Sequence, residues 1–530
     1  MDYPVESFSP DERAALTPYV TNLDRPVFAL VNLPETVKGA LFARYSRYQG
    51  TLRRLFLDEF AADLDGAAAR AFEGAEGERA AALYRRVFLG YGDDSVAQLG
   101  GAHVACEWVS NVLTKVLERG RLAAYLEQST RYIPYDAPMP GGRYRYWRDA
   151  SLGPAFARAM DHLFDAYAGS LPAVEAWAAG RFPRADGEPE AAHRRSIRAK
   201  ALDLLRGLLP AASLSHVGIF ATGQAYEALV LRLLASPLPE ARTVGRMVLE
   251  ELQKVMPSFL ARVDRPERGG RWIAYLEERQ RTARRCAARL GLDHESAAEV
   301  GAPSVRLLGV HGSEEDLLTA LLFEAAAVSE ERARDAVAAL SAEERRVLLA
   351  DLVGERENRR HRPGRGFEAV RYRFEIVADY GAFRDLQRHR MLTVQWQALT
   401  PDLGAEVPAE LEAAGVADAF RAGLERSRTE YERLVGAGRP EVAPYALCLA
   451  FRIRFVLDLN AREAMHLVEL RSGREGHPSY RAVAQEMHAQ IAGAHPAVAA
   501  AMTHVDRDSE PRLERIRSEI RTHARQAAGA

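Results

Sequence analysis

The chain has 530 residues, of which 48% are hydrophobic and 27% are charged, and 71 basic against 73 acidic residues give a net charge of −2. This length exceeds what one hydrophobic core supports and predicts at least two domains. The charge balance excludes a general nucleic-acid binder, which needs a surplus of Lys and Arg to neutralise phosphates.

Three cysteines, Cys106, Cys286 and Cys448, lie far apart and form no CxxC pair. The sequence therefore predicts neither a metal site nor a disulfide framework. Residues 1–6 have no basic or apolar leader, and no apolar run is long enough to cross a bilayer. We expect a cytoplasmic, reduced protein with no membrane partner.

The periodicity of apolar residues predicts a mostly helical chain with few strands. In chain order, the predicted elements are a strand at Pro26–Val31, helices at Ala80–Leu89 and Ala201–Leu209, a strand at Ser304–Val310, helices at Glu315–Ala327 and Ala342–Leu352, and a strand at Ala369–Val377. Helices and strands do not alternate regularly, so the fold class is α+β rather than doubly wound.

A polar, Gly-rich stretch, Arg265–Gly270, predicts a boundary between two domains, residues 1–265 and 271–530. A second fragile stretch, residues 355–366 (ERENRRHRPGRG), is densely basic and broken by a proline. It is an exposed loop or a phosphate-facing loop, and the sequence leaves both interpretations open.

The first polar motif is Arg119-Gly120-Arg121, seven residues, then Ser129-Thr130-Arg131-Tyr132. We expect Gly120 to cap the C-terminus of a helix that ends at Arg119. The planar guanidinium groups and a serine hydroxyl can donate hydrogen bonds to a phosphate. Glu127 can accept a hydrogen bond from a base N–H or a ribose hydroxyl, so the set suits a mononucleotide. The alternative is a helix end that carries solvated charges.

A partial copy occurs in the second half: Arg388-His389-Arg390, seven residues, then Ala398-Leu399-Thr400. The flanking arginines should keep His389 neutral at pH 7, because nearby positive charge disfavours its protonation. The histidine can then stack on a ring system while the arginines hold a pyrophosphate. The alternative is a basic, exposed helix end.

The duplication extends to Gln224–Ser236 and Asn460–Ser472, which share apolar positions and differ in polar ones. Gln224 stands for Asn460, Tyr226 for Arg462, Val230 for His466 and Ala235 for Arg471. A copy that keeps its core and loses its polar side keeps its fold and loses ligand contacts. Individually, Asn460 is also a candidate N-cap, Arg462 an exposed charge and His466 a core histidine.

Arg206 stands on an apolar segment four residues before Pro210, and it needs an anionic partner or a route to water. No convincing triad, metalloprotease, dinucleotide or P-loop motif is present, so no catalytic nucleophile is predicted. Binding and orientation of a cofactor fits these residues better.

Together these motifs resemble the flavin-dependent thymidylate synthases, the ThyX family, whose hallmark is Arg-His-Arg, seven residues, then Ser. The resemblance is to a tandem-duplicated and diverged member. It implies two helix-rich α+β domains with small, mostly antiparallel sheets. It also implies FAD as cofactor, with NADPH and methylenetetrahydrofolate as co-substrates in the conversion of dUMP to dTMP.

Carried over by position, the resemblance assigns dUMP contacts to Arg119, Glu127, Ser129, Arg131, Arg206 and Arg471. It assigns FAD contacts to Glu368, Arg388, His389, Arg390, Asn460, Arg462 and His466. The first domain would then be the nucleotide-binding half and the second the flavin-binding half. The small-molecule nucleotide would bind in composite sites, and a homodimer would form a pseudo-tetramer. The alternative is a non-catalytic flavin- or nucleotide-binding paralogue with a regulatory or structural role.

Overall fold

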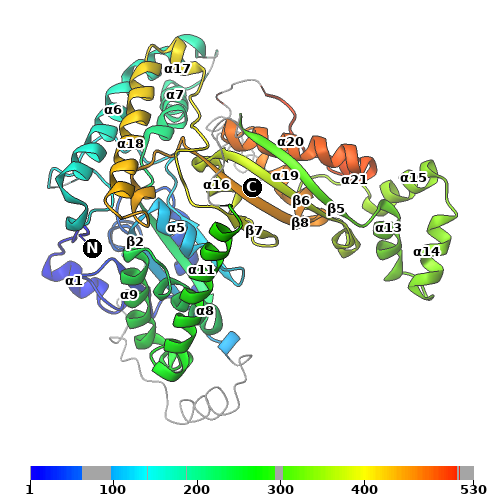
Figure 1. The fold of residues 1–530 in the computed structure, drawn as a ribbon, viewed down its shortest axis with the longest axis horizontal. Coiled ribbons are helices and arrows are strands. Elements are labelled where there is room, and N and C mark those ends of the chain that lie inside the picture. Colours follow the sequence, from blue (N-terminus) through cyan, green and yellow to red (C-terminus); the bar gives the residue numbers. More distant parts are fainter. Residues whose placement is uncertain are drawn as a thin grey trace. The chain divides into compact units, whose positions relative to one another are not determined.

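The structure contains two four-stranded antiparallel sheets with the same strand order (Figure 1), and it is a computed structural model that describes residues 2–61, 97–139, 141–184, 186, 188–292, 302–509 and 513. The first sheet has the order β1-β2-β4-β3 and the second β5-β6-β8-β7. Matching strand orders confirm a tandem duplication in an α+β fold.

The first repeat contains the four strands of the first sheet and the helices before, between and after them in the sequence. They are α1 (Pro10–Leu16), β1 (Val27–Leu30), α2 (Glu35–Tyr45), α3 (Leu52–Glu59), β2 (Gly101–Ser110), α5 (Asn111–Leu117), β3 (Ala123–Glu127), α6 (Gly153–Arg181), α7 (Glu190–Leu205), β4 (Leu214–Thr222), α8 (Gly223–Leu234), α9 (Pro239–Val255), α10 (Pro257–Leu260), a π-helical turn (Pro266–Gly270) and α11 (Arg271–Arg289).

The second repeat has the same strand order, and helices α13 to α15 lie between β5 and β6 in the sequence. Its elements are β5 (Ser304–His311), α13 (Glu314–Phe323), α14 (Glu330–Ala338), α15 (Ala342–Val353), β6 (Arg371–Asp379), α16 (Tyr380–Leu386), β7 (Thr393–Trp396), α17 (Glu410–Ala413), α18 (Ala417–Gly436), β8 (Arg452–Asn460), α19 (Ala461–Arg471), α20 (Pro478–Ala494) and α21 (Pro496–Ala500).

The chain divides into two compact units that do not coincide with the sequence halves throughout. The first unit is Met1–Ala168, Leu209–Ser296 and Glu425–Cys448; the second is Gly169–Leu208, Ala297–Leu424 and Leu449–Ala530. In the sequence, residues 265–271 follow the last strand of the first sheet and precede the first strand of the second, and they lie within the first unit. Each unit, however, also contains a segment from the other sequence half.

The helices next to the polar motifs all begin directly after a strand, at a capping residue. Ser110 caps α5, Thr222 caps α8, Asp379 caps α16 and Asn460 caps α19, each accepting a hydrogen bond from a backbone N–H three residues ahead. Such a side chain satisfies a donor that the helix leaves open at its first turn. The Asn460 side chain is therefore used as an N-cap, one of the two roles that the sequence predicted for it.

The three predicted strands correspond to β1, β5 and β6, and Ala342–Leu352 corresponds to α15. Two predicted helices end earlier than expected: α13 ends at Phe323, and α7, which starts already at Glu190, ends at Leu205, where a 3-10 turn (Arg206–Leu208) takes over. The predicted helix Ala80–Leu89 lies outside the described residues. No helix within the described ranges combines the length and the apolarity needed to cross a membrane.

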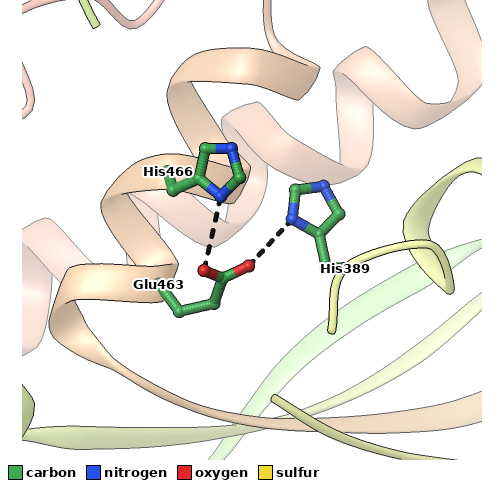
Figure 2. A group of neighbouring side chains, drawn as sticks. All are labelled: His389, Glu463 and His466. Atoms are coloured by element: carbon green, nitrogen blue, oxygen red, sulfur yellow. Dashed lines mark hydrogen bonds and ion pairs between the residues drawn. The ribbon is translucent and has the colours of Figure 1, made fainter. Parts of the chain in front are cut away.

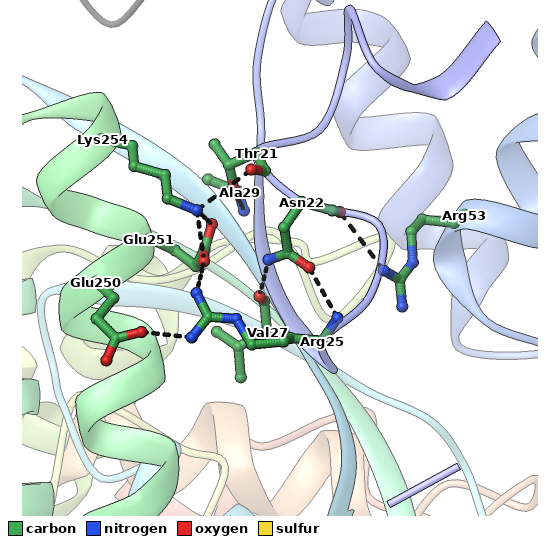
Figure 3. A network of polar contacts seen from close by, with 9 residues as sticks. All are labelled: Thr21, Asn22, Arg25, Val27, Ala29, Arg53, Glu250, Glu251 and Lys254. Atoms are coloured by element: carbon green, nitrogen blue, oxygen red, sulfur yellow. Dashed lines mark hydrogen bonds and ion pairs between the residues drawn. The ribbon is translucent and has the colours of Figure 1, made fainter. Parts of the chain in front are cut away.

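Ion pairs hold the loop before β1 to helix α9 in the first unit (Figure 3). Arg25 pairs with the exposed Glu250 and donates to the fully buried side chain of Glu251 at 2.7 Å. Lys254 reaches the same carboxylate at 2.8 Å. Asn22 closes the loop, because its side chain accepts from the Arg25 backbone N–H and donates to a carbonyl of β1. These contacts fix the edge strand over the core of the unit.

A buried carboxylate, Glu240 at the start of α9, connects three segments of the first unit. It accepts from the Ser110 backbone N–H at 2.8 Å, from the Ser110 hydroxyl at 2.6 Å and from the Tyr445 hydroxyl at 2.7 Å. Burial raises the pKa of Glu240 to about 7, against the hydrogen bonds, which favour the charged form.

This raised pKa predicts a pH-dependent stability. The folded state binds the Glu240 proton more tightly than the unfolded chain does, so its stabilisation is complete below pH 4.5 and is lost as the pH rises to 7. We expect the free energy of unfolding to fall by about 3 kcal/mol over this range, and Glu240→Gln to remove that fall. Urea unfolding at several pH values measures it.

The control is Glu250→Gln, which removes an exposed carboxylate from the same helix and should leave the pH dependence unchanged. Equal pH dependence in wild type and Glu240→Gln would contradict the assignment.

Candidate functional site

The Arg-His-Arg motif of the second repeat lies just beyond the C-terminus of α16, in the second unit. Asp379 fixes the start of this short helix by accepting from the Ala382 backbone N–H at 2.9 Å. His389 is buried, Arg388 is partly buried and Arg390 is exposed. The turn after α16 therefore directs the middle residue of the motif inward.

His389 belongs to a chain of hydrogen bonds with helix α19 (Figure 2). Arg471 donates from Nε to His389 Nε2 at 3.0 Å, and His389 Nδ1 lies 2.9 Å from Glu463 Oε1. His466 Nδ1 lies 3.3 Å from the other oxygen of Glu463. A guanidinium can only donate, so Nε2 of His389 must accept and Nδ1 must carry the proton that is donated to Glu463.

The two members of this pair have shifted pKa values. Burial lowers the pKa of His389 to about 4, with Arg471 acting in the same direction and the hydrogen bond to Glu463 acting against it. Burial opposes ionisation of Glu463, but hydrogen bonds from His389 and His466 outweigh it and lower its pKa to about 2. His389 is thus neutral at pH 7, as predicted, but burial is the larger cause and not the arginines beside it in sequence.

His389, Glu463 and His466 also form a group whose potential metal-ligand atoms all lie within 4.8 Å of one another, the one such group within the described ranges. A metal on His389 Nδ1 would leave the proton on Nε2, where it would face the N–H of Arg471. The hydrogen-bond chain already satisfies each of these ring and carboxylate atoms. The arrangement therefore favours hydrogen bonds with fixed proton positions over a bound metal ion at these side chains.

Three arginines from separate segments surround one carboxylate beside this chain. Asp385 lies 3.6 Å from Arg206, 3.6 Å from Arg388 and 3.8 Å from Arg471. A second carboxyl, Asp379, is fully buried, which raises its pKa, while the charge of Arg206 lowers it. Three guanidiniums thus face two carboxyls here, and the ionised Glu463 lies beyond His389 in the adjoining hydrogen-bond chain. We call Arg206, Arg388, Arg471 and Asp385 the arginine cluster.

The remaining predicted flavin contacts also belong to the second unit. Arg462 donates to the Pro363 carbonyl at 3.0 Å and lies 3.9 Å from Glu368, which also pairs with Arg365 at 3.1 Å. The basic stretch 355–366 is not wholly exposed, since the side chain of its first arginine, Arg356, is buried against Glu469 at 2.6 Å. All predicted flavin contacts therefore lie in the second unit, where they form separate small groups of interacting side chains.

The structure divides the predicted dUMP contacts between the two units. Arg206 and Arg471 belong to the second unit, and the others to the first. In the first unit Glu127 is buried and pairs with Lys115 at 3.1 Å, while Lys115 also pairs with Glu118. The Ser129 hydroxyl accepts from the Arg131 backbone N–H at 3.2 Å. Arg119 is exposed.

The expectation for Gly120 is wrong. Helix α5 ends at Leu117 with Glu118 as its C-cap, and Gly120 does not have a positive φ. A side chain at this position would instead meet Tyr125, since a Cβ on Gly120 would lie 2.6 Å from the Tyr125 hydroxyl. The tyrosine occupies the space into which a side chain at this middle position would project.

Sequence reasoning missed Asp385 and Glu463 as members of the site. Glu463 has the same residue type at its counterpart, Glu227, so a search for polar positions that differ between the repeats passes over it. Its spacing of three residues before His466 on a helix was the available signal.

The cause of the low His389 pKa can be tested by substitution. Removing the charge of Arg471 in Arg471→Met should raise the pKa of His389 above 4, whereas Glu463→Gln should not raise it. Arg390→Met is the matched control, because this exposed arginine is adjacent in sequence, and it should leave the pKa unchanged. Nitrogen-15 NMR of labelled histidines measures all three. An equal rise in Arg390→Met would show that the flanking charges dominate after all.

Comparison with known proteins places these motifs in a family. The sequence model of the family described as thymidylate synthase complementing protein matches residues 53–258 and 316–497, which is more than half of the chain in two successive segments. The two segments agree with the two repeats of the fold, and they confirm the resemblance to the ThyX family.

Full-length relatives and solved structures are also similar. A UPF0159 protein of Chlamydia muridarum is 38% identical, covering 98% of this chain and 99% of the relative. One of Thermoplasma acidophilum is 30% identical, covering 92% and 99%. A solved UMP/dUMP methylase from Streptomyces cacaoi is 22% identical, covering 40% of this chain and 98% of that one, with a TM-score of 0.32. The chain belongs to the thymidylate synthase complementing protein family.

Proposed function

We propose that the chain is a flavin-dependent thymidylate synthase-like enzyme that methylates dUMP reductively to dTMP, with methylenetetrahydrofolate and NADPH as co-substrates and FAD as cofactor. The observation that carries this proposal is the arginine cluster, which places three guanidiniums around one carboxylate beside a buried, neutral histidine. Family membership supports it.

The residues present fit a nucleotide-containing cofactor. Arg388 offers a guanidinium for a pyrophosphate, and Arg206 and Arg471 offer two more for a nucleotide phosphate. Each is partly held by Asp385 at 3.6 to 3.8 Å, a separation that an incoming phosphate can compete with. The bound flavin would supply the reducing equivalents for the transferred carbon.

His389 has a defined role in this proposal. Its proton is committed to Glu463 and its other nitrogen to Arg471, so the ring is held in one orientation and one protonation state. A neutral ring adds no charge next to a flavin or a pyrimidine and presents an aromatic face. Glu463 acts as a positioning residue, because it touches the histidine rather than a ligand.

The second candidate is a non-catalytic flavin- or nucleotide-binding paralogue, and one observation favours it. Glu127 is engaged with Lys115 in a buried pair, so a nucleotide in the first repeat would have to displace a lysine to use this carboxylate. The first proposal also includes a composite site, a homodimer that forms a pseudo-tetramer, and a cytoplasmic location.

Flavin retention tests the division of ligand contacts between the repeats. Arg388→Ala should abolish co-purification of FAD, because it removes a phosphate contact in the second unit. Arg131→Ala should spare it, because its contacts lie in the first unit. The absorbance of purified protein near 450 nm, on the order of a flavin per chain, measures the outcome. Unchanged retention in both variants would contradict the composite site.

Tritium release decides between the two candidate functions. With dUMP labelled at C5, the proposed enzyme, loaded with FAD, releases tritium when NADPH and methylenetetrahydrofolate are both present, and omission of either one stops release. Arg206→Ala and Arg471→Ala should each reduce the rate by at least about tenfold, the effect of losing one charge-assisted phosphate contact. A protein that retains flavin yet releases no tritium is the non-catalytic paralogue.

A further inference from the structure

A cavity of about 400 Å³ lies in the first unit, between helix α8, the π-helical turn Pro266–Gly270 and the first turns of α11. This volume falls in the range of small-molecule sites. Charged and aromatic side chains dominate its lining, which includes Glu227, Arg262, Arg268, Arg271, Trp272 and Tyr275.

One wall of the cavity has a shape that only glycine allows. A Cβ on Gly269 would lie 2.0 Å from the carbonyl oxygen of Val263, a distance that excludes any side chain. The Gly269 backbone N–H donates to the Arg262 carbonyl at 3.0 Å and closes the turn. Single π-helical turns occur often at functional sites. The wall is therefore a tightly closed backbone segment rather than an open loop.

The floor of the cavity contains a carboxylate that both repeats retain. Glu227 is the counterpart of Glu463, from the same pairing that sets Gln224 against Asn460. Glu463 accepts from two histidines, but the first repeat has Gly120 and Val230 at those positions. Glu227 instead accepts from Arg262 Nε at 2.9 Å and from its Nη2 at 2.5 Å. This pairing fixes the plane of the guanidinium.

The new partner comes from outside the part of the chain that the family shares. Residues 262–275 lie between the two matched segments, 53–258 and 316–497. Most of the lining thus lies outside the segments that the family model matches, and none of it belongs to the arginine cluster.

The exposed side of the cavity combines aromatic rings with positive charge. Trp272 is 48% exposed and Tyr275 is 62% exposed, and they lie one helical turn apart on α11. Arg268 and Arg271 bring cations to the same lining, and Glu267 brings a carboxylate. Large aromatic rings left accessible next to arginines suit a ligand that is planar at one end and anionic at the other.

We propose that this cavity is a second nucleotide site, which binds a nucleoside monophosphate with its base against Trp272 and Tyr275 and its phosphate at Arg271. Glu267 is the available acceptor for a base N–H or a ribose hydroxyl. The site is separate from the one in the second unit, and its occupation does not depend on the activity proposed above.

Trp272 provides the signal for a direct test. The full-length chain, as wild type and with Arg388→Ala, is titrated with UMP, dUMP, CMP, AMP and GMP while tryptophan fluorescence is monitored. We expect saturable quenching by at least one nucleotide, equal in both proteins. Trp272→Phe should remove the quenching and keep the binding heat in calorimetry, since a phenylalanine ring still stacks. Arg271→Ala should weaken binding about tenfold, the effect of one charge-assisted contact.

Arg284→Ala is the matched control, an arginine on the same helix that does not line the cavity. It should bind like wild type. The proposal is overturned by the absence of saturable quenching at millimolar nucleotide, by quenching that survives Trp272→Phe, by binding lost in Arg388→Ala, or by equal weakening in Arg271→Ala and Arg284→Ala. The substituted side chains of α11 are all exposed, and circular dichroism verifies that the variants are folded.

Discussion

The hydrogen bond from Arg471 to His389 determines which nitrogen of the His389 ring carries the proton, and the other polar contacts of the site in the second repeat depend on it. Because the guanidinium donates, the histidine must donate in turn, and Glu463 must stay ionised to accept. Helix α19 therefore has to present Glu463, His466 and Arg471 on one side while its other side packs in the core. The Asn460 cap and strand β8 fix where that helix starts, and so determine which residues point toward the motif.

Each compact unit contains a segment from the other half of the sequence, so the units and the repeats do not coincide. Arg206 belongs to the first sequence half, yet it lies 3.6 Å from Asp385 in the second unit. A phosphate site assembled from Arg206, Arg388 and Arg471 thus draws on both halves of the sequence within one compact unit.

Two buried carboxylates of the first repeat form ion pairs with basic side chains of the same repeat. Glu127 pairs with Lys115, and Glu227 pairs with Arg262. A buried carboxylate without a partner would be strongly destabilising, and each of these two has a basic side chain as its partner. The two ion pairs differ in their surroundings. The pair at Glu127 is sealed in the core, whereas the pair at Glu227 forms the floor of a cavity with accessible aromatic rings.

The sequence by itself determined the duplication, the α+β class, the family and the strands β1, β5 and β6, because these rest on local patterns and on a motif with fixed spacing. It did not reveal β2 and β4, whose nearly continuous burial gives no alternation, and it passed over β8, whose alternation was present. Only the tertiary structure decided that Arg206 joins Asp385, that Glu463 orients His389 and that the Tyr125 hydroxyl lies beside Gly120. Each of these is a contact between segments distant in sequence or set by backbone direction, and local periodicity carries no information about either.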